Sequence, residues 1–346
     1  MGCVESGDEI FNHKMKFVVE PSTQFPVSPQ TIKEIKELNI IGLRKEDNGP
    51  LIQFLNSMRG LRLENITIRA SLLSPSVFQM LSVVMRECPH LRSLTIACVQ
   101  VVLESMKHIV AGIKECGNLH ILCLEFNDIR CREFKILLRE LENTSITHLS
   151  LDRNKGSMSI TNARLMNTVL PRCHLKELVL TGLDMKSRDF IAFRDVIRNT
   201  KIEVLSVRDN HLTDEAIIGF EVGGSLGIFD MAHNIDTTDK TNKYLLELYA
   251  PKLQMVKLSH FGMSDDIVNS INIPNWSQLR CIDYGWSLGG HREERLRRQM
   301  FGNHSWKSRI MVTLASGLQI GRLGVGGVYG RCFCMDLLKM LIKYLN

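Results

Sequence analysis

An aliphatic triplet that returns ten times along the chain constrains the fold more than any other feature of this sequence. In its ideal form the triplet has the pattern L-x-x-L-x-L, and consecutive copies begin 24 to 29 residues apart. The copies begin at Ile35, Leu63, Leu91, Leu119, Ile146, Leu175, Ile202, Leu226, Leu253 and Leu279. A period of this length is typical of stacked units, because one unit alone cannot bury its apolar face. The period therefore predicts a solenoid.

One repeat contains a strand followed by a helix. Residues 119–129 alternate between apolar and polar positions around Leu122 and Leu124, as a strand with one buried face does. Residues 131–141 then place four apolar side chains at helical spacing, namely Phe134, Leu137, Leu138 and Leu141. Strands pack more closely than helices, so a stack of such units must bend toward its strands. We expect an α/β solenoid of about ten repeats, a horseshoe with parallel strands on its concave face and helices on its convex face.

The repeat resembles the ribonuclease-inhibitor class of leucine-rich repeat over residues 35–286. In that family a polar turn residue satisfies backbone groups between adjacent units, and the matching positions here are Asn127, Asn154, Asn210 and Asn234. The other six repeats have Leu43, Ser71, Val99, Leu183, Phe261 and Ser287 at this place. The resemblance implies an intracellular scaffold that binds another protein.

Charge and composition divide the chain into three parts. Residues 1–34 contain Pro21, Pro26 and Pro29 and are expected to form an extended lead-in to the array at 35–286. Residues 287–346 hold ten Lys or Arg against three Asp or Glu, a charge of +7, so the rest of the chain carries −1. A nearly neutral repeat body argues against binding of nucleic acid. Residues 336–345 have a broad apolar face, which fits either a cap over the solenoid end or a helix on a membrane surface.

The residues offer no support for an enzyme or a metalloprotein. Ten cysteines lie at irregular spacing, and none forms the C-x-x-C pairs of a zinc site. We therefore expect free thiols, a reducing compartment, no metal and no cofactor. No local motif for a catalytic nucleophile or a phosphate loop appears. We expect His211, Asp214 and Glu215 to belong to a helix start and not to a catalytic site.

The expected partner site follows the strands. Strand side chains that do not enter the core project from the concave face, and aromatic and Arg side chains contribute most to binding energy in protein interfaces. The predicted binding residues are Glu125, Phe126, Asp152, Arg153, Arg208, Asp209, His233 and Trp286.

The N-terminus carries a second signal. Its first six residues, M-G-C-V-E-S, match the M-G-x-x-x-[ST] pattern for myristoylation of Gly2, and Cys3 stands where a second acyl chain is commonly added. The alternative is a plain N-terminus without a lipid, because Asp8 and Glu9 would weaken attraction to anionic lipid.

These features predict a monomeric, non-enzymatic scaffold or adaptor in the cytoplasm, either fully soluble or tethered to the inner face of a membrane. Its partner is expected to be a protein bound on the concave strand face. The alternative is a regulator of a small GTPase, because GTPase-activating proteins of the Ran family use this repeat class. That alternative depends on fold analogy alone.

Overall fold

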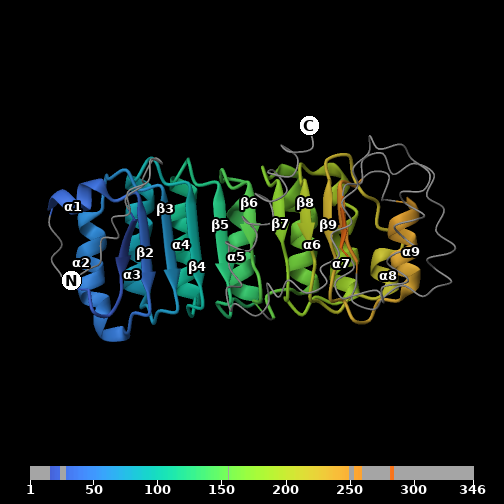
Figure 1. Ribbon diagram of the computed structural model, residues 1–346, viewed down its shortest axis with the longest axis horizontal. Helices are drawn as coiled ribbons and strands as arrows, with labels where there is room; N and C mark the ends of the chain where they lie inside the picture. The colour runs from blue at the N-terminus through green and yellow to red at the C-terminus, as the bar shows by residue number, and fades with distance from the viewer. Residues whose placement is uncertain (1–15, 24–28, 155, 249–252, 259–280, 284–346) are drawn as a thin grey trace. The chain divides into compact units, whose positions relative to one another are not determined.

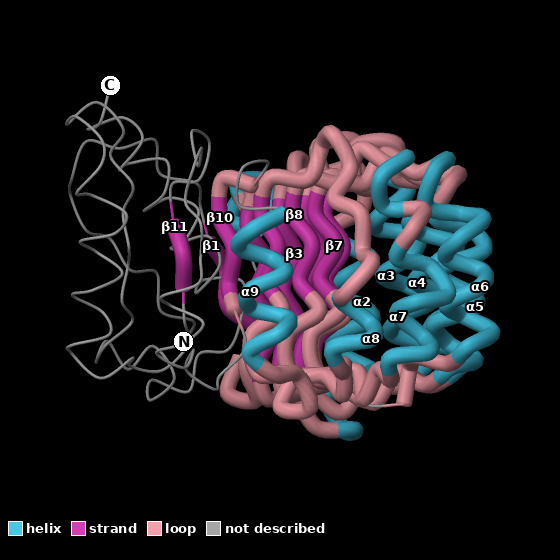
Figure 2. The backbone as a smooth tube through the Cα atoms, turned by 90° about the vertical axis from the view of Figure 1, so that its right-hand side faces the viewer, coloured by secondary structure: helices cyan, strands magenta, loops and turns pink. Residues whose placement is uncertain are grey.

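The computed structural model describes residues 16–23, 29–154, 156–248, 253–258 and 281–283. The chain divides into two compact units, Met1–Leu178 and Val179–Asn346. Both units repeat a strand and a helix, as Figure 1 shows, so the fold is the α/β solenoid that the triplet predicts. In each unit the strands form one layer and the helices another (Figure 2).

The first unit contains a parallel sheet whose strands follow one another in chain order. The strands are β1 (Lys16–Val19), β2 (Glu37–Ile41), β3 (Asn65–Arg69), β4 (Ser93–Ala97), β5 (Ile121–Glu125) and β6 (His148–Ser150). The middle aliphatic of each triplet aligns with that of the next, as Leu94 does with Leu122 and Leu122 does with Leu149. The repeat period of the sequence is therefore the register of the sheet.

The helices of this unit pack their apolar faces against the sheet. They are α1 (Pro29–Glu34), α2 (Asn48–Ser57), α3 (Pro75–Glu87), α4 (Leu103–Glu115), α5 (Cys131–Leu141) and α6 (Ile160–Val169), with short 3-10 helices at Lys45–Asp47 and Leu170–Arg172. The predicted face of α5 is confirmed, since its four apolar residues are at most 1% exposed. Helices α3 and α4 approach closely at Gly112, where a Cβ atom would lie 2.9 Å from the Ser82 Cα.

The second unit has shorter elements around an aromatic core. Strand β7 (Glu177–Val179) spans the unit boundary, and β8 (Val204–Ser206), β9 (Ile228–Asp230), β10 (Met255–Lys257) and β11 (Cys281–Asp283) pair in parallel in that order. The helices are α7 (Ser187–Arg194), α8 (Asp214–Ile217) and α9 (Asp239–Leu248), with a 3-10 helix at Ile197–Asn199. The buried Phe220 ring lies 5.5 Å from that of Phe190 and 5.2 Å from that of Phe229.

The repeat structure begins earlier than the triplets predict. Strand β1 and helix α1 lie within residues 1–34, which were expected to be an extended lead-in. Strand β1 pairs with β2, and its Val19 side chain is fully buried. The sequence missed this repeat because residues 16–19 carry no L-x-x-L-x-L triplet.

Buried asparagines join adjacent repeats, as the family resemblance implies. The Asn154 Oδ1 atom accepts hydrogen bonds from the backbone N–H groups of Asn127 (3.0 Å) and Ile129 (3.1 Å) in the preceding repeat. Its Nδ2 atom donates to the carbonyls of Leu124 (2.6 Å) and Leu151 (2.8 Å). One side chain therefore satisfies four backbone groups that would otherwise be buried without a partner.

The other asparagines repeat this arrangement. In the second unit the Asn210 Oδ1 atom accepts from the N–H groups of Leu183 and Met185, both at 3.0 Å. The Asn234 Oδ1 atom accepts from the Leu212 N–H at 3.1 Å. One repeat has Ser71 in place of the asparagine. There the Ser71 hydroxyl makes one of these contacts, because its oxygen accepts a hydrogen bond from the Leu43 N–H at 3.1 Å.

Buried thiols occupy the helix ends of the first unit. Six cysteines of the first unit have free thiols, and among them Cys88, Cys116 and Cys173 are buried at helix ends. Burial raises the pKa of Cys88 to about 11 and that of Cys173 to about 12. These thiols remain protonated at neutral pH and serve as core side chains.

The asparagine contacts predict a large cost for one deletion. We expect Asn154→Ala to lower the free energy of unfolding by about 3 kcal/mol, because buried backbone groups in two repeats lose their partners. Thermal unfolding followed by circular dichroism measures the effect. The exposed Asn167→Ala variant in α6 serves as a control and should leave the transition unchanged; similar transitions for both variants would contradict this role of Asn154.

Candidate partner-binding surface

Most repeats have one left-handed residue shortly after the strand, one residue beyond the end of β2 to β5 and three residues beyond the end of β6 to β9. At this position φ lies between +46° and +70° in Gly42, Ala70, Cys98, Phe126, Arg153, Gly182, Asp209 and His233. Each of these residues comes immediately before the polar turn position described above. Glycine adopts this conformation freely, whereas other L-residues pay about 1 kcal/mol or more for it.

Backbone hydrogen bonds fix this conformation. The Phe126 N–H donates to the Asp152 carbonyl at 2.9 Å, and the Asp209 N–H donates to the Ala232 carbonyl at 2.9 Å. The following asparagine is buried, so the left-handed residue before it turns its own side chain away from the core. Four of the eight predicted binding residues, Phe126, Arg153, Asp209 and His233, share this position.

Phe126 and Arg153 form a pair in the first unit. The Arg153 guanidinium lies over the Phe126 ring, 5.5 Å from its centroid, in a cation–π contact. Phe126 is 39% exposed, and Arg153 is exposed as well. Such a contact contributes about 0.5–1 kcal/mol at an exposed site. The pair therefore presents an aromatic face and a cation that already hold each other in position.

Of the two carboxylates beside this pair, Glu125 is more buried than the sequence predicts. Glu125 was expected to project as an open contact, but it is only 2% exposed and accepts a hydrogen bond from the Ser150 hydroxyl at 3.2 Å. Asp152 is half-buried. We conclude that Phe126 and Arg153 are the more accessible members of this group.

In the second unit Arg208 and His233 contact each other. The Arg208 Nη2 atom lies 2.6 Å from the His233 Nε2 atom. A guanidinium can only donate, so the His233 Nε2 atom accepts in this contact. Asp209, which follows Arg208 in the sequence, is exposed. This group offers a carboxylate and a hydrogen-bonding pair, but no aromatic anchor.

Three predicted residues lie outside the described part of the chain: Trp286, Gly2 and Cys3. The predicted cap at residues 336–345 and the basic segment 287–346 lie outside it as well. Conversely, the sequence missed Cys98, an exposed residue at the left-handed position one repeat before Phe126. Cys98 could have been identified from the sequence, because it lies directly before Val99, which occupies the turn position of that repeat.

Asp214, the first residue of α8, has structural contacts. The Asp214 carboxylate accepts hydrogen bonds from the N–H and hydroxyl of Thr238 and from the hydroxyl of Thr241, at 2.6 to 2.7 Å. Burial raises the pKa of Asp214, but these hydrogen bonds outweigh it and lower the pKa. An ionised carboxylate held in this way stabilises the chain before α9 and is a poor general base. No group of three His, Cys, Asp or Glu residues suited to a metal occurs among the described residues.

Comparison with known proteins adds little beyond the fold. No protein-family model matches the chain, and no curated protein matches it. A crystal structure of the yeast Rad7 and Elc1 complex is similar at a TM-score of 0.46 and 17% identity, over 78% of this chain and 76% of that one. A TLR13 complex with the RNA ssRNA13 is similar at a TM-score of 0.47 and 13% identity, over 79% of this chain and 39% of that one.

None of the described helices has the length and apolar character that crossing a bilayer requires.

The left-handed backbone predicts an unusual order of stability at position 126. We expect Phe126→Gly to be more stable than Phe126→Ala by about 1 kcal/mol, because only glycine adopts positive φ without strain. Exposed helix positions have the opposite order, so Arg132→Gly and Arg132→Ala in α5 form the matched control. Thermal unfolding of the four variants measures both differences. An alanine variant more stable than the glycine variant at position 126 would contradict the assignment.

Proposed function

We propose that this protein is a non-enzymatic interaction scaffold of the ribonuclease-inhibitor-like repeat class, and that its partner is a protein bound on the exposed strand face. One observation supports this most strongly. Bulky side chains occupy a left-handed position that favours glycine, and they lie at the surface, where the fold gains little from them. Backbone strain of this kind is common where side chains serve binding.

Phe126 is the strongest candidate for an anchor. Six large hydrophobic side chains are exposed in the described part of the chain, and Phe126 is the only aromatic one among them. Its contact with Arg153 restricts both side chains before any partner arrives. Preorganisation of this kind lowers the entropy lost on binding. Arg is also among the residues that contribute most to interface energy.

The second unit carries a polar group of its own. Arg208, Asp209 and His233 offer both charge signs and hydrogen-bond donors and acceptors. Such groups favour specificity and association rate more than affinity. We assign the anchor to Phe126 and Arg153 in the first unit, and treat these three residues as a separate polar contact of the second unit.

A comparison of variants at one backbone position tests the anchor. We expect Phe126→Gly with Arg153→Gly to weaken partner binding at least about tenfold, since two anchor side chains are lost while the backbone conformation is kept. Immobilised full-length protein captures partners from cells, and quantitative mass spectrometry compares the variants. The control is Ala70→Gly, which makes the same backbone change without removing an aromatic ring or a cation. A double variant that captures the same proteins as wild type would refute the assignment.

We also propose that the chain is tethered to the inner face of a membrane through Gly2, with Cys3 as a second acylation site. The motif at residues 1–6 supports this. Expression in a eukaryotic cell should add a myristoyl mass that disappears in Gly2→Ala, together with membrane association. An unmodified mass for the wild type would leave a soluble adaptor.

A further inference from the structure

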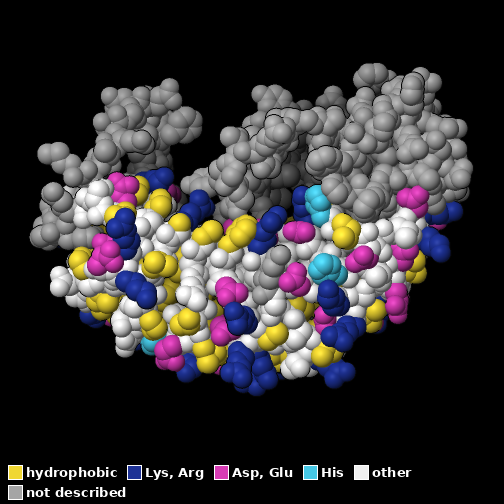
Figure 3. All heavy atoms as spheres, turned by 90° about the horizontal axis from the view of Figure 1, so that it is seen from below, with side chains coloured by type: hydrophobic (Ala, Val, Ile, Leu, Met, Phe, Trp, Pro, Cys, Tyr) yellow, Lys and Arg dark blue, Asp and Glu magenta, His cyan; other side chains and the backbone are white. Residues whose placement is uncertain are grey.

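Four cations form a patch on the helix layer of the first unit. Arg132, Lys135 and Arg139 lie at i, i+3 and i+7 on α5, and Arg164 lies on the neighbouring helix α6. The three Arg side chains are exposed and Lys135 is half-buried. Seven residues of helix span about 10 Å, and neighbouring helices lie about 10 Å apart, so the four charges share one small area. Figure 3 shows groups of Lys and Arg side chains on the face seen from below, with acidic and hydrophobic side chains between them.

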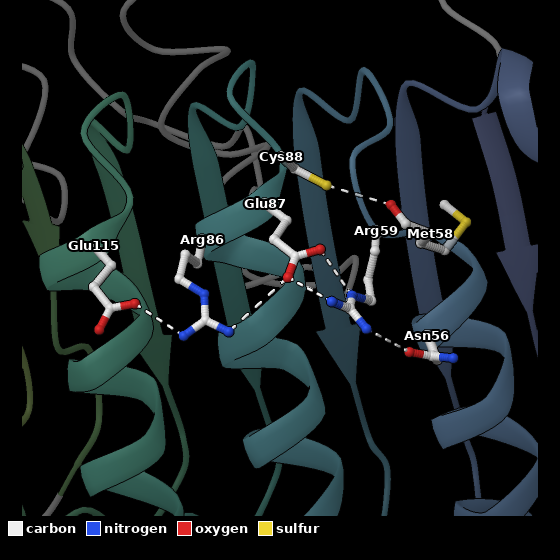
Figure 4. Close-up of polar contacts among 7 residues, drawn as sticks. All are labelled: Asn56, Met58, Arg59, Arg86, Glu87, Cys88 and Glu115. Atoms are coloured by element: carbon white, nitrogen blue, oxygen red, sulfur yellow. Dashed lines mark hydrogen bonds and ion pairs between the residues drawn. The ribbon is translucent and has the colours of Figure 1, made fainter.

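The cations of α3 and α4, and Arg59 after α2, are neutralised instead. After α2, the Arg59 guanidinium forms two 2.7 Å hydrogen bonds with the Glu87 carboxylate, and Arg86 of α3 contacts Glu115 at 3.2 Å (Figure 4). The hydrogen bond with Arg59 lowers the pKa of Glu87. On α4, Lys107 pairs with Glu104 at 2.8 Å. Positive charge on these helices is therefore balanced locally.

The patch on α5 and α6 lacks this balance. Among the described residues, no carboxylate forms an ion pair with Arg132, Lys135, Arg139 or Arg164, and α6 itself contains no acidic residue.

Both acids of α5 have other roles. Glu133 accepts a hydrogen bond from the Arg130 N–H at the start of the helix, and Glu140 pairs with Lys114 of α4 at 2.8 Å. The patch therefore presents a net positive surface to whatever approaches the helix layer.

We propose that this patch, defined by Arg132, Lys135, Arg139 and Arg164, docks the protein onto an anionic lipid surface. Protein interfaces typically have an apolar core, yet none of the large exposed hydrophobic side chains of the described residues belongs to α5 or α6. Attraction to anionic lipid requires only clustered cations, and it adds up over each Lys or Arg near the surface.

The inference deepens the proposed tethering at Gly2. A single myristoyl chain holds a protein to a membrane only marginally, and a basic patch is one of the second signals that make the attachment stable. The patch lies on the helix layer of the first unit, whereas Phe126 and Arg153 lie on its strand layer. Docking through the helices would therefore leave the partner surface free.

Vesicle binding by the full-length protein tests the patch. Protein made without an acyl chain is mixed with vesicles of phosphatidylcholine alone or of phosphatidylcholine with phosphatidylserine, and the bound fraction is measured by co-sedimentation. We expect a preference for phosphatidylserine that falls about tenfold or more in the Arg132→Gln, Lys135→Gln, Arg139→Gln and Arg164→Gln quadruple variant. Added salt should weaken wild-type binding, because exposed charges are screened.

A matched control separates the patch from net charge. Lys45→Gln, Arg62→Gln, Arg92→Gln and Lys201→Gln together remove the same charge at exposed residues outside α5 and α6, and this variant should bind like wild type. Equal losses in the two variants, a loss in neither, or a wild type without preference for phosphatidylserine would overturn the proposal. Because the protein in this experiment is made without an acyl chain, its binding does not depend on the tether at Gly2. The same vesicle series with myristoylated protein then measures the binding that the acyl chain adds.

Discussion

The buried asparagine that follows the strand in four repeats is the interaction on which the rest of the structure depends. A solenoid turns the chain sharply at every repeat, and each turn leaves backbone groups that water cannot reach. Asn154 satisfies four such groups, three of them in the preceding repeat. Burial of the aliphatic triplets supplies the driving force for stacking. The asparagine contacts decide how one repeat fits onto the next.

The same turns determine which side chains reach the surface. The residue at the turn position is buried, whether it is an asparagine or a residue such as Leu183, and the residue before it takes a left-handed conformation. The fold therefore has one left-handed residue at a fixed position in each of these repeats, and the residue type at that position varies from repeat to repeat. Glycine at position 182 costs nothing, whereas Phe126 and Arg153 cost conformational energy and form a cation–π pair. The proposed partner site depends on this one backbone position.

Much of the fold follows from the sequence, because its signals are local and periodic. The triplets predict the strands and their register, and the helical spacing of Phe134 to Leu141 predicts the buried face of α5. Strand β1 escapes prediction because its sequence, KFVV, lacks the triplet and is identified only by its pairing with β2. The burial of Glu125 escapes as well, since alternation along a strand gives the direction of a side chain but not what surrounds it. Positive φ at Phe126 depends on hydrogen bonds between repeats, which a single repeat does not reveal.

The central claim is that partners bind at the left-handed residues that follow the strands. Its most direct test is site-specific photo-crosslinking in cells. A photoreactive amino acid replaces Phe126 in one variant and the half-buried Lys135 on the helix layer in another. The account predicts that position 126 yields a discrete protein adduct, and that this adduct is absent when the probe is at position 135. The same protein adduct from position 135 alone, or from both positions equally, would contradict binding through the strand face.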